Sequence, residues 1–229
     1  MLHHIFRNLW NSRKRNVWIL LELIVITIVC WMVVDPLFVI FYNKSIPDGY
    51  EADGLYRLQL SVVPSDEEIR PEDFRQLMER LRSHEQIESA TYVLNNHYPC
   101  SRGNSFNNLT LDTMSVRVAF MNFVPHTDFF QTWRIRSAKD GTWESLENAE
   151  YTVNSILMTS DAAACLSPDK DLTGGVVYVR DSIPLKVVAL MQPVKMKNCM
   201  QPYYLRFNAH TDGIPSWAYD GGLIVFART

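Results

Sequence analysis

A nearly continuous apolar run from Val17 to Tyr42 constrains this chain more than any other feature. A helix rises about 1.5 Å per residue, so this run would extend about 39 Å, whereas the hydrocarbon core of a bilayer is about 30 Å thick. The apolar run of a signal peptide is shorter, about 7–15 residues, and a small-x-small cleavage site follows it. The residues after Tyr42, "NKSIPDGY", contain no such site. The sequence therefore predicts an uncleaved transmembrane helix over residues 17–42.

Charged residues are distributed unevenly around this helix. Four basic residues and no acidic residue precede it, namely Arg7, Arg13, Lys14 and Arg15. The whole chain has 22 basic and 25 acidic residues, and two of the acidic ones lie inside the apolar run, so residues 43–229 carry a net charge of −5. Because basic residues flank the cytoplasmic end of a membrane helix, residues 1–16 are predicted to be cytoplasmic and residues 43–229 to be exported.

Residues 1–16 carry a second membrane signal. Apolar residues recur there at helical spacing, namely Leu2, Ile5, Phe6, Leu9 and Trp10. This stripe predicts a short amphipathic helix that lies along the cytoplasmic surface of the membrane, next to the basic turn Arg13–Arg15. A simple anchor does not need such a helix, so Phe6, Trp10 and the basic turn are candidate coupling residues.

Three residues interrupt the apolar run: Glu22, Asp35 and Pro36. Glu22 either reaches toward the cytoplasmic interface or faces another helix, because an intramembrane acid usually faces protein. Asp35 would lie about 27 Å along the helix from Val17, near the outer interface. Pro36 removes a backbone N–H and is predicted to kink the helix, as a hinge to a stalk outside the membrane.

The exported part, residues 43–229, is predicted to be one α+β domain. The segment "LYRLQLSVV" alternates like a strand, "RPEDFRQLMERLRSHEQI" begins a helix at Pro71, and "IESATYVL" is a second strand. A right-handed crossover would place both strands in one sheet. The polar segment over residues 95–113 is predicted to be a loop or a small excursion from the fold.

The remaining chain is predicted to be rich in strands. "SVRVAFMNFV" alternates, "HTDFFQTW" could be a short helix, and "TVNSILMTSDAAACL" reads as a strand followed by a helix capped at Thr159 or Ser160. Four further strands are predicted in "GGVVYVR", "IPLKVVALMQPVKM", "PYYLRFNA" and "GGLIVFART". The aromatic group of Phe129, Phe130 and Trp133 could bind a ligand, but core packing is the favoured interpretation.

Nothing in the sequence indicates a catalytic centre, a metal site or a cofactor. Phosphate-loop, G-x-S-x-G, H-E-x-x-H and C-x-x-C patterns are missing. A net charge of −3 without a basic face argues against nucleic-acid binding. A Cys100–Cys199 bridge is possible in an oxidising compartment, and the sequence does not decide it. A structural, binding or force-transmitting role is therefore favoured over catalysis.

Taken in order, these segments resemble the N-terminal half of MacB/FtsX-like ABC-transporter permeases. "FRNLWNSRKRNVW" is similar to the cytoplasmic helix and basic turn before the first membrane helix of that family. "FVPHTDFFQTWRIRSAKDGTW" is similar to a segment of its exported domain, with Val124, Asp128, Phe129 and Ile135 at pattern positions. "VNSILMTSDAAACLSP" resembles its strand-then-helix element, and "IPLKVVALMQPVKM" resembles the strand that follows.

The resemblance implies a location, partners and a mode of action. It implies a periplasmic domain of MacB core type in the bacterial inner membrane, a homodimer or heterodimer of permeases, and a separate or fused cytoplasmic ABC ATPase. The permease would have no catalytic residues, and ATPase-driven motion would pass through the membrane helix to the periplasmic domain for export, lipoprotein extraction or hydrolase activation. Three further membrane helices would follow Thr229, so the chain resembles a truncated permease or a stand-alone derivative.

Two other functions remain open from the residues. A single-pass membrane protein could bind a ligand or partner through its exported domain. A membrane-anchored hydrolase would require a Ser/His/Asp cluster or a metal site that forms only in three dimensions. The transported substrate and any outer-membrane partner are not indicated by the sequence.

Overall fold

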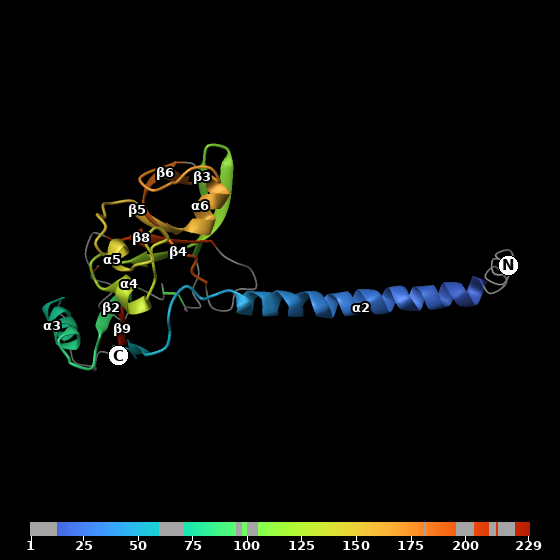
Figure 1. Ribbon diagram of the computed structural model, residues 1–229, viewed down its shortest axis with the longest axis horizontal. Coiled ribbons are helices and arrows are strands. Elements are labelled where there is room, and N and C mark those ends of the chain that lie inside the picture. Colours follow the sequence, from blue (N-terminus) through green and yellow to red (C-terminus); the bar gives the residue numbers. More distant parts are fainter. Residues whose placement is uncertain are drawn as a thin grey trace, which may run out of the picture. The chain divides into compact units, whose positions relative to one another are not determined.

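The computed structural model describes residues 13–59, 71–94, 98–99, 105–180, 182–195, 204–210, 214 and 223–229. The chain divides into two compact units, Met1–Ile46 and Pro47–Thr229. Helix α2 (Arg13–Ser45) belongs to the first unit, and all the strands and the other described helices belong to the second (Figure 1).

Helix α2 consists almost wholly of apolar residues, begins at Arg13 and ends at Ser45. It continues through Pro36, so the proline does not end it. Two hydroxyl groups bond back to the helix itself: Thr27 Oγ1 donates to the Leu23 carbonyl, and Ser45 Oγ donates to the Tyr42 carbonyl, each at 2.7 Å. Such bonds leave these hydroxyls satisfied without water, as a lipid environment requires.

A three-stranded sheet in the second unit has the order β1-β9-β2, formed by Leu55–Gln59, Leu223–Arg228 and Ser89–Leu94. Strands β1 and β2 both run antiparallel to β9 and are therefore parallel to each other. Helix α3 (Pro71–Arg82) connects them in sequence and buries Phe74 and Met78. The predicted β-α-β start is confirmed, and the C-terminal strand lies between its two strands.

The other six strands form a closed barrel in the order β3-β4-β8-β5-β7-β6. In chain order they are β3 (Ser105–Leu111), β4 (Met114–Phe123), β5 (Ser155–Thr159), β6 (Val176–Val179), β7 (Ile183–Met191) and β8 (Tyr204–Ala209). Strands β4 and β8 are parallel, as are β5 and β7, and the other pairs are antiparallel. Pairing of Leu109 with Val179 closes the barrel between β3 and β6.

The predicted loop over residues 95–113 is wrong for residues 105–111, which form β3. The strand is not evident in the sequence, because it contains Asn107 and Asn108 and asparagine is typical of turns. In the structure Leu109 is fully buried opposite Val116 of β4. Pairing with two other strands, β4 and β6, determines that this segment is a strand. Its local composition does not predict one.

Two apolar clusters lie on the two faces of the barrel strands. Inside the barrel, Val118, Ile156 and Val187 pack with residues of α6 (Ser160–Leu166). On the outer face, the side chains of the same strands join the core formed with the three-stranded sheet, β9 included, and with α4 (Phe129–Trp133): Ala119, Met121, Phe123, Leu157 and Phe207. The alternation of each strand therefore supplies both clusters, and the α+β fold class is confirmed.

Candidate functional site

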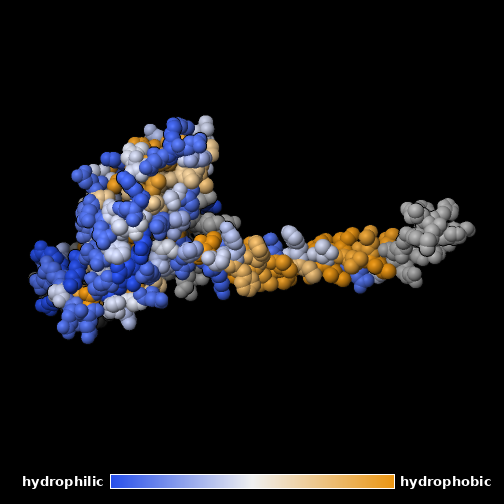
Figure 2. Space-filling model, viewed as in Figure 1, coloured by the Kyte–Doolittle hydropathy of each residue, from blue (hydrophilic) through white to orange (hydrophobic). Residues whose placement is uncertain are grey.

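Helix α2 carries the membrane character of the chain. Its segment Val17–Ser45 is long and apolar enough to cross a membrane, and none of its most apolar window is buried in the structure. Trp31 and Met32 are 70% and 69% exposed, and Figure 2 shows a largely hydrophobic surface along this helix. A contiguous apolar surface of this kind is unfavourable in water and marks a membrane or protein contact.

The residues predicted to couple motion lie on or before α2. Glu22 and Asp35 are exposed in the helix, and Pro36 lies within it. Arg13, Lys14 and Arg15 form its first turn, and their side chains lie outside the described part of the structure. Phe6 and Trp10, and with them the predicted amphipathic helix, also lie outside the described residues, as do Cys100 and Cys199. The structure therefore does not bring these residues together into one site.

A half-buried carboxylate holds the start of α4. Glu147, the last residue of α5 (Glu144–Glu147), accepts hydrogen bonds from the backbone N–H groups of Asp128 at 2.9 Å and Phe130 at 3.1 Å. Burial raises the pKa of the Glu147 carboxyl above its usual range, although these two N–H groups oppose the shift. Asp128 itself has a left-handed backbone, with φ of 58°. Both oxygens face backbone amides, so this cluster serves the fold.

The prediction that the aromatic group packs in the core is confirmed. Phe129, Phe130 and Trp133 are each fully buried, and Phe129 and Phe130 lie edge to face with ring centroids 5.2 Å apart. Of the family-pattern positions, Val124 and Ile135 are also buried. These positions therefore contribute to packing within the second unit.

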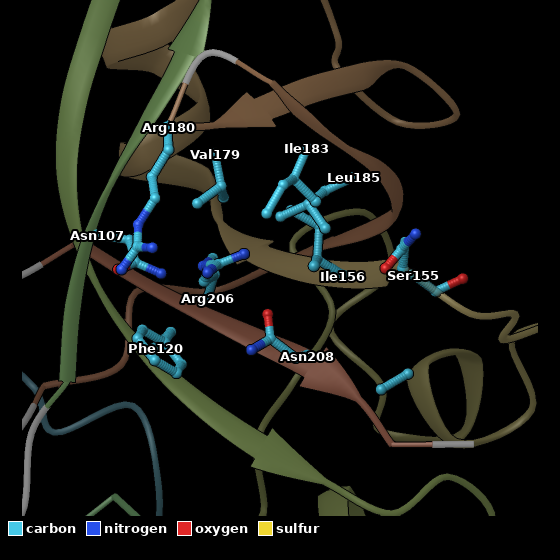
Figure 3. Close-up of a pocket in the computed structure, with 12 residues that line it drawn as sticks. Asn107, Phe120, Ser155, Ile156, Val179, Arg180, Ile183, Leu185, Arg206 and Asn208 are labelled. Carbon is cyan, nitrogen blue, oxygen red and sulfur yellow. The ribbon is translucent and has the colours of Figure 1, made fainter. Parts of the chain in front are cut away.

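A cavity of about 310 Å³ opens inside the barrel, and residues from all six strands line it (Figure 3). Helix α6 begins where β5 ends, whereas the cavity lies at the start of β5, beside Asn154 and Ser155. The polar lining consists of Asn107, Asn154, Ser155, Arg180, Arg206 and Asn208, and the remaining walls are apolar. Barrel mouths of this size and composition commonly hold small ligands.

Arg206 is the one charged group of this lining that is buried, with 4% of its surface exposed. Its guanidinium lies 5.1 Å from the centre of the Phe120 ring. Asn107, turned so that its amide oxygen faces Arg206, accepts a hydrogen bond from Nη2 at 3.0 Å. The buried Nε has no hydrogen-bond partner. Burial lowers the pKa of Arg206 to about 10, so the side chain stays positively charged at neutral pH.

A second buried arginine, Arg228, shows what a structural role looks like. Its Nε donates to the Thr132 carbonyl at 2.7 Å, its Nη1 to the Asp53 carbonyl at 2.9 Å, and its Nη2 to the Glu51 carbonyl at 2.5 Å. These bonds join β9 to α4 and to the segment before β1. Every nitrogen of Arg228 therefore has an acceptor, whereas Arg206 keeps a buried donor free.

Sequence reasoning missed the cavity. Arg206 and Asn208 belong to "PYYLRFNA", which was assigned only as a strand, and Asn107 belongs to the segment assigned as a loop. One signal was available: Arg206 and Asn208 are two residues apart on either side of the fully buried Phe207. Alternation therefore places both polar side chains on the same face, opposite a core residue.

No group of three or more His, Cys, Asp or Glu side chains in the described ranges is arranged to hold a metal ion. The cavity is thus defined by amide groups and arginines, which suit an anion more than a cation.

No protein-family model matches the chain, and no curated protein matches it in sequence. Among solved structures, the extracellular domain of the noncanonic ABC-type transporter YknZ from Gram-positive bacteria is 10% identical, with a TM-score of 0.42 over 76% of this chain and 83% of that one. The periplasmic region of MacB from Actinobacillus actinomycetemcomitans is 9% identical, with a TM-score of 0.42 over 82% of this chain and 80% of that one.

A third similar structure is a domain of a protein described as a permease from Porphyromonas gingivalis, at 13% identity and a TM-score of 0.43, over 63% of this chain and 56% of that one. All three are distant likenesses in fold, at low sequence identity.

Proposed function

We propose that the chain is a permease-type component of an ABC transporter of the MacB/FtsX kind. In this proposal α2 crosses the membrane, residues 1–16 face the cytoplasm, and residues 43–229 form an extracytoplasmic domain. The observation that carries it is the apolar segment Val17–Ser45, whose most apolar window is entirely unburied. A flank that contains Arg13, Lys14 and Arg15 supports the orientation.

The proposed mechanism is mechanical. A cytoplasmic ATPase would act on the segment that contains Phe6 and Trp10, and α2 would carry the motion to the exported unit. A helix suits this role because its backbone hydrogen bonds hold one residue to the next along its length, and α2 extends from Arg13 to Ser45. The proposed hinge lies at Pro36 because proline has no backbone N–H to donate to the preceding turn. Glu22 would face a second membrane helix, of this subunit or its dimer partner, and Asp35 with Pro36 would form the hinge at the outer interface.

The orientation is tested with alkaline phosphatase fused after Thr229 in bacterial cells. We expect active phosphatase in a membrane fraction that resists an alkaline wash. Replacing Arg13, Lys14 and Arg15 together by glutamine should lower this activity, because the charge asymmetry is lost. A Lys44→Gln variant, changed at the other end of the helix, is the matched control and should keep it. Release of the chain into the soluble fraction would refute the membrane assignment.

The transporter role is tested separately by co-purification from the native cell. We expect a P-loop ATPase to accompany the full-length gene product, and Trp10→Ala to lower its yield while membrane insertion is retained. Glu85→Gln, an exposed change in the second unit, is the control and should keep the ATPase bound. Correct insertion with no ATPase in either sample would refute the permease role but not the topology.

A second candidate function is a single-pass membrane protein that binds a ligand through its exported domain. The barrel cavity with its buried Arg206 favours this candidate specifically. It predicts ligand binding that does not depend on Trp10 or on any ATPase.

A further inference from the structure

We propose that the barrel cavity binds a small organic hydroxycarboxylate, whose carboxylate pairs with Arg206 and whose hydroxyl donates to Asn208. The proposal is independent of the transporter role, because it concerns only the second unit. It begins from Arg206, a guanidinium that is 4% exposed and has a buried Nε without a hydrogen-bond partner.

The positive charge of Arg206 is buried without a negatively charged partner among the described residues. Burying a charge is costly unless it is paired and hydrogen-bonded, and no carboxylate within the described residues forms a salt bridge with it. The lining residues include two arginines and no acid. Asn107 and the face of the Phe120 ring meet only part of this need, so an anion from outside would complete the pairing.

Asn208 adds a second requirement. Its Nδ2 donates to Asn122 Oδ1 at 2.9 Å, which fixes the orientation of the amide. Its Oδ1 is buried and has no donor, and Figure 3 shows this oxygen directed to the side of the cavity where Arg206 lies. A free donor on Arg206 and a free acceptor on Asn208 are matched by a ligand that carries an acceptor and a donor close together. A carboxylate with an adjacent hydroxyl has this pattern.

The apolar walls of the cavity indicate that the rest of the ligand is apolar. Ile156, Val179, Ile183 and Leu185 face the cavity (Figure 3), and they would cover an aliphatic or aromatic group by burying its apolar surface. The volume of about 310 Å³ suits a small molecule. One buried guanidinium matches a single negative charge, which favours a monocarboxylate over a phosphate dianion.

Arg180 lies at the exposed rim of the same cavity, directly after β6. Its side chain extends toward Asn107 (Figure 3). A charge at the rim attracts anions toward the mouth and increases the association rate more than the final affinity. Arg206 would therefore hold the ligand, and Arg180 would guide it.

The test is isothermal titration of the full-length chain in detergent micelles with mandelate, an aromatic hydroxycarboxylate. Phenylacetate lacks the hydroxyl, mandelamide lacks the charge, and inorganic phosphate tests the other anion. We expect mandelate to bind more tightly than phenylacetate by about fivefold, as one hydrogen bond allows, and mandelamide and phosphate not to bind. Absence of mandelate binding, or equal binding of mandelamide or phosphate, would overturn the proposal.

Variants locate the binding. Arg206→Met should weaken mandelate binding at least about tenfold, the loss expected for one charged hydrogen bond. Asn208→Ala should abolish the preference for mandelate over phenylacetate. Arg75→Met is the control, because the Arg75 side chain is 68% exposed on α3 and should be irrelevant. Unchanged binding in Arg206→Met, with the circular dichroism of the wild type, would also overturn the proposal.

A carboxylate of the chain itself is the competing occupant. Asp181 and Asp212 are nearby in sequence to Arg180 and Asn208 and lie outside the described residues. If the double variant D181N/D212N binds mandelate with wild-type affinity, neither carboxylate occupies the cavity and the proposal of an external ligand is supported. If the double variant binds at least about tenfold more tightly, the cavity is filled by the chain and the proposal fails.

Discussion

Glu147 offers the sharpest stability prediction, because one side chain holds the start of α4. In Glu147→Ala the N–H groups of Asp128 and Phe130 lose their acceptor oxygens, which lie 2.9 and 3.1 Å away. An unsatisfied buried N–H costs about 1–3 kcal/mol. The carboxylate is itself disfavoured by burial, so part of this loss is offset. We expect Glu147→Ala to lower the free energy of unfolding by about 2–4 kcal/mol, within this range for two groups.

Glu147→Gln is the matched variant. Its amide oxygen can accept one of the two hydrogen bonds, so we expect about half of the cost of Glu147→Ala. The measurement is urea unfolding of the full-length chain in micelles, followed by the fluorescence of the tryptophans, which include the buried Trp133. A loss below about 0.5 kcal/mol in Glu147→Ala would refute the role of Glu147 in holding α4.

The pH dependence follows from the same group. Burial raises the pKa of Glu147 in the folded state above its ordinary value of 4.5, so the folded chain binds this proton more tightly than the unfolded chain. Stability should therefore rise as pH falls through the raised folded pKa, and it should level off below the unfolded pKa. Because other carboxyls also titrate, the quantity to measure is the wild-type stability minus that of Glu147→Gln between neutral and mildly acidic pH. A difference that falls with decreasing pH would contradict the assignment.

Two further pairs of variants test the fold. At Gly49, with φ of 73°, a Cβ would lie 2.0 Å from the Pro193 carbonyl oxygen, whereas at Gly141, also at φ of 73°, a Cβ would meet nothing within 4 Å. Gly49→Ala should therefore lower the melting temperature much more than Gly141→Ala. Equal losses in the two variants would refute the close approach at Gly49. Arg228→Met should cost about 2–4 kcal/mol because three carbonyls lose a charged donor. Arg206→Met should be no less stable than the wild type without ligand, because burial disfavours the charged guanidinium and lowers its pKa to about 10. A large loss of stability would show that Arg206 is structural.

Local patterns were sufficient where one face of an element is apolar. The helix predicted to begin at Pro71 is α3, which buries Phe74 and Met78, and the alternating segment "SVRVAFMNFV" forms most of β4. The aromatic residues of α4 were correctly assigned to the core, because side chains of that size seldom remain in water. The cytoplasmic helix and the roles of Glu22, Asp35 and Pro36 stay predictions.

The amino-acid sequence by itself determined the membrane-compatible helix, the α+β class and most of the strands, because length and periodicity report which surfaces avoid water. Only the tertiary structure decided that β9 lies between β1 and β2 and that β3 closes a barrel with β6. It alone also brought Asn107 and Arg206 together from distant strands around one cavity. Strand partners and buried charges depend on contacts between residues far apart in the chain, and no local pattern encodes which of those contacts form.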